Sequence, residues 1–283
     1  MRARTKNVEE RGIWMNNCVF VNCKAVSASH CIDATPPAPL DTQHCHDTYE
    51  VLYIISGKGE YLVEGSTFAI LPGTLMLIRP LVYHSVRLDP SVQYERYVIN
   101  FSTEGIMGEA LDLLESMLDE DPECTGGRYF VASCLPQAAI NVFERLRELV
   151  PMQQGKRRLY AKTLIAELIV LLSLSNGEKM YHNEIELGAR VIRYLNENLD
   201  RDISLDKLAK MFFVSKYYLC RAFKKHNGIS IHGYVNQKRV MYAKQFIESG
   251  ETASAAAYRV GFGDYSSFYR AYVKVIGKAP TAP

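Results

Sequence analysis

Residues 204–240 read SLDKLAKMFFVSKYYLCRAFKKHNGISIHGYVNQKRV, and this stretch decides the fold of the C-terminal part of the chain. Ser204, Ser215 and Ser230 each stand directly before a run with helical spacing of apolar side chains. A serine oxygen there can accept hydrogen bonds from the first free N–H groups of a helix. Gly228 can end the second run, because glycine adopts the left-handed conformation of a helix terminus. The stretch therefore predicts two helices joined by a turn, followed by a long helix.

The same order returns at the end of the chain. Thr252 opens a short helix that closes near Gly261, and Asp264 can cap a last helix that Gly277 and Pro280 stop. The long helix between the two units has about 20 residues and spans ~30 Å at ~1.5 Å per residue. One turn of B-DNA measures ~34 Å. The sequence thus predicts two helix-turn-helix units whose second helices can enter successive major grooves.

The charge of the chain is divided in the same place. Residues 185–283 hold 16 Lys/Arg against 8 Asp/Glu, a net charge of +8, whereas residues 1–184 hold 17 against 23, a net charge of −6. A basic segment behind an acidic one favours a polyanionic partner. The candidate DNA contacts are Lys216, Tyr217, Arg221, Lys224 and Lys225 in the first unit and Tyr265, Ser266, Tyr269, Arg270 and Lys274 in the second. Arginine can read guanine, and lysine and serine can hold phosphates.

Residues 185–280 resemble the AraC/XylS family of bacterial transcription regulators. The resemblance rests on LAK–S–YL–R–FKK–G within 208–228 and on RVGF–D–SSF–R–G–P within 259–280. It implies a double helix-turn-helix domain, promoter DNA and RNA polymerase as partners, and activation rather than repression of transcription. The positions that match base-contacting positions of the family are Tyr217, Cys220, Arg221, Tyr265, Ser266, Tyr269 and Arg270.

The second unit departs from the family pattern. Ala253 and Ala256 stand where larger aliphatic residues are usual, and Tyr272–Val273 stands where Phe–Lys is common. Small side chains bury less apolar area, at ~25 cal/mol per Å². We therefore predict that the second unit is the less stable one and contributes less to DNA affinity.

The first part of the chain has a different pattern. Residues 19–101 contain short segments rich in Tyr, Ile, Val and Leu, separated by Gly, Pro and Asp, which is typical of a β-sandwich or small barrel. From Met107 to Leu174 the apolar spacing becomes helical. This β-rich front followed by helices resembles the cupin-like sensing half of many AraC-type regulators. The expected fold is α+β with two domains: a cupin-like β-barrel (1–106), a helical extension that is a candidate dimerisation region of a homodimer (107–176), a linker (177–184) and an all-α DNA-binding domain (185–283).

The stretch HCHDTYE, residues 44–50, carries the cupin resemblance. His44, His46, Glu50 and Gly57 match the spacing of the first cupin motif, and His84 stands where the second motif has its histidine. His44 and His46 are two residues apart and so share a face of an extended strand. Candidate effector-binding residues are His44, His46, Glu50, Arg79, Tyr83 and His84. Tyr53 has the opposite parity to Glu50 and is predicted to point outward.

Two uses of these residues stay open. A barrel lined with His, Glu, Tyr and Arg suits a polar small molecule such as a sugar. His44, His46, Glu50 and His84 could instead hold a divalent transition metal, the less favoured reading. We expect a regulator that is not an enzyme and needs no cofactor. The alternatives are a metal-dependent cupin enzyme fused to a DNA-binding domain, and a constitutive DNA binder with a degenerate barrel.

Location and assembly can also be predicted. Seven cysteines without a CxxC pair favour a reducing cytoplasm, and Cys18, Cys23, Cys31 and Cys45 are expected to be buried thiols rather than redox sensors. We expect no secretory signal, and the apolar run 164–174 is too short to span a membrane. One apolar helix face is formed by Ala161, Leu164, Ile165, Leu168, Leu171 and Leu172. It is expected to be intramolecular core, with the seam of a homodimer as the alternative.

Overall fold

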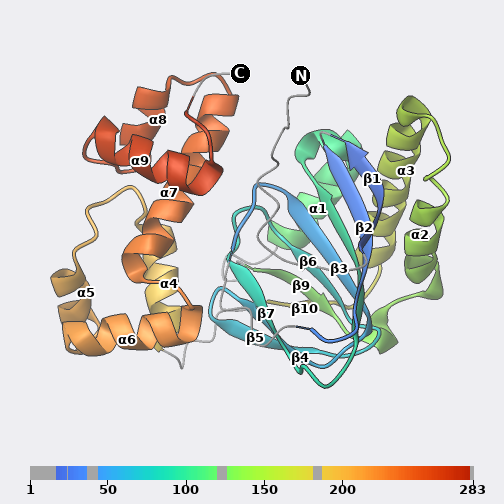
Figure 1. Cartoon of the computed structure of the whole chain (residues 1–283), viewed down its shortest axis with the longest axis horizontal. Coiled ribbons are helices and arrows are strands. Elements are labelled where there is room, and N and C mark those ends of the chain that lie inside the picture. Colours follow the sequence, from blue (N-terminus) through green and yellow to red (C-terminus); the bar gives the residue numbers. More distant parts are fainter. Residues whose placement is uncertain (1–16, 24, 37–43, 120–125, 181–186, 281–283) are drawn as a thin grey trace. The chain divides into compact units, whose positions relative to one another are not determined.

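The computed structural model describes residues 17–23, 25–36, 44–119, 126–180 and 187–280. The chain divides into two compact units, one formed by residues 15–184 and the other containing residues 185–283 (Figure 1). The first unit has the expected cupin-like β architecture and the second is entirely helical over its described residues. The fold is therefore α+β with two domains.

Two sheets build the first unit. The larger has the order β1-β2-β8-β3-β6-β9-β10 and the smaller the order β5-β4-β7. The strands are β1 (Asn17–Cys23), β2 (Val26–Asp33), β3 (Tyr49–Ser56), β4 (Gly59–Val63), β5 (Ser66–Ile70), β6 (Leu75–Ile78), β7 (His84–Leu88), β8 (Tyr94–Phe101), β9 (Gly127–Phe130) and β10 (Glu178–Lys179). All their pairings are antiparallel.

Apolar side chains from both sheets fill the space between them. Leu52 and Ile54 of β3 meet Tyr61 and Val63 of β4 in one buried cluster, which Ile70 of β5 completes. Glu50 has the same parity as Leu52 and therefore also points between the sheets. A carboxylate in this interior is the first sign of a functional site.

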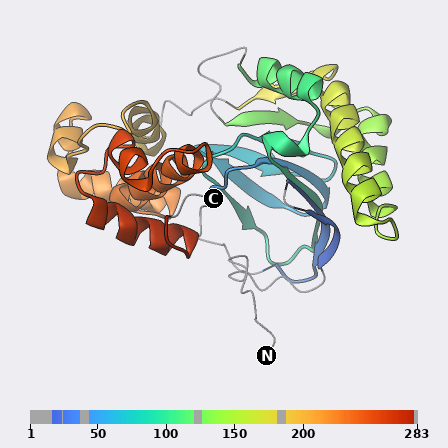
Figure 2. The ribbon, with the colours of Figure 1, turned by 90° about the horizontal axis from the view of Figure 1, so that it is seen from above.

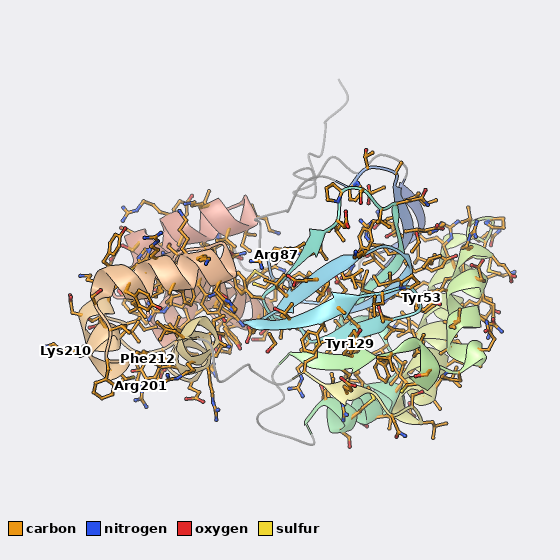
Figure 3. The ribbon with its side chains drawn as sticks, turned by 90° about the horizontal axis from the view of Figure 1, so that it is seen from below. Tyr53, Arg87, Tyr129, Arg201, Lys210 and Phe212 are labelled. Atoms are coloured by element: carbon orange, nitrogen blue, oxygen red, sulfur yellow. The ribbon has the colours of Figure 1, made fainter. Side chains whose placement is uncertain are left out.

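Helices cover the other face of the larger sheet. They are α1 (Gly108–Asp119), α2 (Gln137–Arg147) and α3 (Gln154–Ser173), and Figure 2 shows α2 and α3 against that face. Tyr53, labelled in Figure 3, points to this side and stacks on Phe143 of α2 with ring centroids 5.1 Å apart. Its outward orientation is as its parity predicts. No helix within the described ranges has the length and apolar character needed to cross a membrane.

The apolar face of α3 belongs to this core. Ala161, Leu164, Ile165, Leu168 and Leu172 are buried in the cluster with the sheet, and Leu171 packs against it. The face is thus intramolecular core, as expected, and it is not available as a dimer seam.

The region 107–176 is not purely helical, contrary to our expectation. Strand β9 lies within it and pairs with β6, and β10 pairs with β9 inside the predicted linker 177–184. Gly127 permits the β9 pairing, since its φ is 132° and a Cβ there would lie 1.9 Å from the Leu77 carbonyl oxygen. The remainder of the linker, 181–184, lies outside the described residues.

The second unit has the predicted repeat. It comprises α4 (Leu187–Glu197), α5 (Leu205–Met211), α6 (Lys216–Asn227), α7 (Ile231–Glu248), α8 (Ala253–Arg259) and α9 (Tyr265–Ile276). The predicted caps are confirmed, because side-chain oxygens of Ser204, Ser215, Ser230, Thr252 and Asp264 each accept a hydrogen bond from the backbone N–H three residues on. Gly228 and Gly277 end α6 and α9 in the left-handed conformation.

Candidate effector and DNA-binding sites

The three histidines predicted for the site meet at one end of the strands of the first unit. His44 forms an isolated antiparallel bridge with His84, and each backbone N–H donates to the other residue's carbonyl oxygen, at 3.1 and 3.0 Å. His84 begins β7 and pairs with Val63, the last residue of β4. Glu50 lies near the start of β3. Residues far apart in sequence are thus joined by strand pairing.

The imidazole rings are close together. The ring centroids of His44 and His84 are 4.5 Å apart, and those of His46 and His84 are 5.0 Å apart. One nitrogen from each of the three rings lies within 4.8 Å of the other two. The burial is graded, because His84 is buried, His46 half-buried and His44 exposed. The cluster therefore has a closed inner side and an open outer side.

Glu50 joins the cluster through both carboxylate oxygens. Its Oε1 accepts a hydrogen bond from the Tyr61 hydroxyl at 2.9 Å and lies 3.9 Å from His84 Nε2. Its Oε2 lies 3.2 Å from His46 Nε2. Although burial raises the pKa of Glu50, the neighbouring imidazoles of His84 and His46 outweigh it and hold that pKa well below its usual range. Glu50 is therefore an ionised carboxylate inside an apolar domain.

Backbone carbonyls fix the orientation of two of the rings. His84 Nδ1 lies 2.9 Å from the Val82 oxygen, and His46 Nδ1 lies 3.0 Å from the Thr48 oxygen. A carbonyl can only accept, so each Nδ1 donates, and the Nε2 of His84 is left as an acceptor in its neutral ring. Burial lowers the pKa of His46, but its hydrogen bond with Glu50 raises it overall, so the protonated ring donates from Nε2 to Glu50. Burial lowers the pKa of His84 to about 3, so this ring is neutral at pH 7. Its Nε2 is buried without a hydrogen-bond partner among the described residues.

The other two residues predicted to bind the effector are Arg79 and Tyr83. Arg79 is half-buried directly after Ile78, which pairs with Glu50, so it is at the same end of the unit. Tyr83 is buried, its backbone N–H donates to Glu64 Oε1 at 3.3 Å, and burial and a hydrogen bond with Cys45 raise its pKa. Because Tyr83 precedes His84 by one residue, its side chain points to the opposite face. The structure does not bring Tyr83 into the histidine cluster.

Two tyrosines of the interior were not predicted. Tyr61 stacks on His84 with ring centroids 5.9 Å apart in addition to its hydrogen bond with Glu50. Tyr94 is also buried in the interior cluster, and burial raises its pKa above the usual range. The alternation of GEYLV indicated which residues of β4 share a face, but no sequence signal indicated that Tyr61 meets Glu50.

The second helix of each helix-turn-helix unit presents the predicted DNA contacts to solvent. The exposed residues are Lys216, Tyr217, Arg221, Lys224 and Lys225 of α6 and Tyr265, Ser266, Tyr269, Arg270 and Lys274 of α9. Cys220 is half-buried. The opposite faces anchor the helices through Leu219 and Phe223 in α6 and Phe268 and Tyr272 in α9, all buried. Each helix therefore has one face for packing and one free for a partner.

Some of these polar groups already have partners within the unit. Lys216 Nζ lies 3.0 Å from Asp206 Oδ2 of α5. Arg270 donates to Ser267 Oγ within α9 at 3.2 Å. The cysteines play no part in these contacts in the described residues: Cys31 and Cys45 are buried as expected, and the side chains of Cys18 and Cys23 lie outside the described structure.

Comparisons with known proteins agree with this architecture. A family model described as the AraC-like ligand binding domain matches residues 27–169, and a helix-turn-helix domain model matches residues 208–282. The HTH-type transcriptional activator RhaS of Enterobacter sp. (strain 638) is 24% identical over 249 residues, which cover 84% of this chain and 85% of the relative. The uncharacterized HTH-type transcriptional regulator YbfI of Bacillus subtilis (strain 168) is 25% identical over 228 residues, 79% of each chain.

A solved structure is similar over most of the chain. Unsaturated fatty acid bound ToxT from Vibrio cholerae strain SCE256 covers 92% of this chain and 95% of its own, with 12% identity and a TM-score of 0.42. The relatives are named as transcription regulators, which decides against the alternative of a metal-dependent cupin enzyme. With a ligand-binding model over half of its length and a helix-turn-helix model over its basic end, the chain belongs to the AraC family of transcription regulators.

Proposed function

We propose that this protein is an effector-controlled transcriptional activator that reads promoter DNA with α6 and α9. The observation that carries the proposal is the pair of solvent-facing basic helices in a unit joined to a domain with a buried ionised carboxylate. Burying a charge costs free energy, and a protein that only binds DNA does not need a buried carboxylate. Activation is supported by the name of the relative RhaS.

The proposed DNA contacts fall into two groups. Arg221 and Arg270 are placed to read base edges, since arginine donates to guanine with two N–H groups. Lys224, Lys225 and Lys274 are placed to hold phosphates, which sets affinity and salt dependence rather than sequence. Lys216, paired with Asp206, is the weakest candidate of the set.

The proposed effector is a small polar molecule rich in hydroxyl groups, such as a sugar. Glu50 and the buried Nε2 of His84 are acceptors. Acceptors select a ligand that donates hydrogen bonds, because a buried acceptor without a donor costs free energy. His44 is exposed and gives such a molecule access.

We further propose that the protein acts as a homodimer in the cytoplasm and contacts RNA polymerase at its promoters. The buried face of α3 is not available to pair two chains. We propose that pairing uses other surfaces of residues 107–176. The exposed apolar side chains of α3 are Leu159, Val170 and Leu174.

A thermal-shift screen of sugars and related metabolites tests the effector site. A ligand at 100 times its Kd should stabilise the first unit by about 2.7 kcal/mol. The stabilisation should be lost in His46→Gln and kept in His30→Gln, since His30 pairs with Glu95 outside the cluster at 2.8 Å. No stabilisation by any metabolite, together with unchanged promoter binding, would favour a constitutive DNA binder.

A further inference from the structure

We infer that Arg239 of α7 holds the two helix-turn-helix units in one arrangement, and thereby sets the spacing between the two blocks of bases that α6 and α9 read. The starting observation is that α7 belongs to both units (Figure 1). In its first half Tyr234 meets Phe223 of α6, with ring centroids 5.8 Å apart. In its second half Val240 and Ala243 pack in the core of α8 and α9. Arg239 lies where the helix passes from one unit to the other.

The Arg239 side chain donates hydrogen bonds to the loop between α4 and α5. Its Nε lies 2.7 Å from the Leu199 carbonyl oxygen, and its Nη2 lies 2.6 Å from the Arg201 carbonyl oxygen. Arginine suits this task because its N–H groups project from one rigid plane toward separate acceptors. The loop ends at Ser204, the cap of α5. Arg239 therefore attaches α7 to the start of the first unit.

The same guanidinium also contacts the second unit. It lies over the ring of Phe262, 5.8 Å from the ring centroid. A cation in this position is attracted to the face of an aromatic ring. Phe262 is buried in the second core and packs edge-on against Phe268 of α9, with ring centroids 5.4 Å apart. One side chain of α7 therefore touches both the loop that leads into α5 and the aromatic residue that packs against α9.

Gly261 brings the loop before α9 directly against the loop before α5. A Cβ at Gly261 would lie 2.7 Å from the Asp200 carbonyl oxygen and 2.9 Å from Arg239 Nη2, so only glycine allows this approach. Asp200 stands between Leu199 and Arg201, the two residues whose carbonyls Arg239 holds. The loops of the two units thus meet backbone to backbone, and Arg239 keeps one of them in place.

A fixed arrangement of α6 and α9 fits one spacing of bases. One base pair more or less moves the second block by about 3.4 Å along the duplex and turns it by about 35° around the axis. Units that could move would follow the block, whereas units held together by Arg239 lose contacts with it. Arg239 uses its N–H groups within the domain, so it positions the reading helices and does not itself read bases. This inference rests on the proposed function, in that α6 and α9 are both taken to read bases.

Binding of the full chain to three duplexes tests the inference. One duplex carries the two-block site selected from random DNA, and the other two have one base pair inserted or removed between the same blocks. The unmodified chain should bind the altered duplexes at least about tenfold more weakly, because base-reading contacts are lost. In Arg239→Gln that factor should fall to about threefold or less, below the loss of one base-reading contact, since α9 can then follow its block.

Two further variants separate the shape of the guanidinium from its charge. Arg239→Lys keeps the charge but has a single ammonium group in place of the rigid fork, so it should behave like Arg239→Gln. Lys244→Gln is the matched control, because it removes a charge from the same helix, where Lys244 Nζ lies 3.5 Å from Glu248 Oε1. It should keep the full penalty for altered spacing. Equal weakening on all three duplexes in both Arg239 variants, with the penalty unchanged, would overturn the inference.

Thermal melting identifies any variant that fails to fold. If both Arg239 variants fail, Phe262→Leu tests the same contact from the other side, because leucine keeps apolar volume in the second core but offers the guanidinium no ring. It should also reduce the penalty for altered spacing, and an unchanged penalty would refute the inference.

Selection of random duplexes separates this inference from the proposed function. If the full chain selects two blocks and the Arg239 variants keep the same single spacing, only the role of Arg239 is refuted. If the full chain selects one block or none, reading by both α6 and α9 fails, and the role of Arg239 falls with it.

Discussion

Tyr61 and Tyr94 are both buried, but their hydroxyl groups differ in hydrogen bonding. The Tyr61 hydroxyl donates to the ionised Glu50, whereas the Tyr94 hydroxyl has no hydrogen-bond partner among the described residues. Tyr61→Phe leaves a buried carboxylate short of a donor and should lower the free energy of unfolding by about 1–3 kcal/mol. Denaturant unfolding with a chelator present measures this change.

Tyr94→Phe is the matched control for Tyr61→Phe. It removes a hydroxyl that makes no recorded hydrogen bond and keeps the ring over which the Arg96 guanidinium lies, 4.4 Å from the ring centroid. It should leave stability unchanged or raise it, because burying a polar group without a partner is costly. Equal destabilisation by the two substitutions would contradict the role given to the Tyr61–Glu50 hydrogen bond.

Arg221 is exposed on α6, and we propose that it reads a base. Arg221→Ala should weaken binding to a specific promoter site by about 1–3 kcal/mol and relax sequence discrimination at one position. Arg158→Ala, which removes an exposed arginine from α3, should do neither. Titration of the selected site and of a scrambled duplex measures both effects, and loss of affinity without loss of discrimination would assign Arg221 to phosphate.

At this scale the sequence predicted much of the site. His44, His46, Glu50 and His84 come together as expected, but not through the parity of one strand, because His44 forms only an isolated bridge and His46 lies before β3 begins at Tyr49. Tyr83 was predicted for the same place but lies beside Cys45 and Glu64. Parity within a strand does not say which strand lies opposite, so the contact of Tyr61 with Glu50 could not be predicted.

Among the elements, α3 shows how burial separates core from interface. Leu168 is 1% exposed in the cluster with the sheet, and Leu159 of the same helix is 68% exposed. Leu168→Ala should lower the free energy of unfolding by about 2–5 kcal/mol, because it leaves a cavity. Leu159→Ala should change it by less than about 0.5 kcal/mol.

Sedimentation of the two α3 variants completes this comparison. Leu168→Ala should leave the association state of the folded protein unchanged. Dissociation of an oligomer by Leu168→Ala, without loss of stability, would mean that the buried face of α3 pairs two chains after all.

The two helix-turn-helix units differ in the side chains that fill their cores. Ala256 and Ala257 of α8 are buried with Phe262, Phe268 and Tyr272, whereas α5 contributes Leu208 to its unit. Because alanines bury less apolar area, we expect amide hydrogens of α8 and α9 to exchange faster than those of α5 and α6. Hydrogen exchange measured by mass spectrometry tests this expectation, and equal or greater protection in α8 and α9 would refute it.

The elements themselves were predictable to different degrees. Every helix of the second unit from α5 to α9 begins after a residue whose side chain caps it, and all five caps were predicted. Strand β9 was missed, because its four residues are held by pairing with β6, about 50 positions earlier, rather than by a local signal.

For the whole molecule, regulation requires the effector to act on the DNA-binding unit. An effector can change DNA binding only by its difference in affinity between the arrangements of the two units. By the same linkage, promoter DNA must change effector affinity by the same factor. The change in effector affinity caused by DNA and the change in DNA affinity caused by the effector should therefore be the same factor.

The central claim is that α6 and α9 together read one promoter site, and selection of random DNA duplexes by the full chain tests it most directly. We predict enrichment of two blocks of bases whose centres lie about 10–10.5 base pairs apart, one helical turn. The first block should lose its sequence preference in Arg221→Ala and the second in Arg270→Ala. No enrichment, or a single block unaffected by Arg270→Ala, would contradict the account.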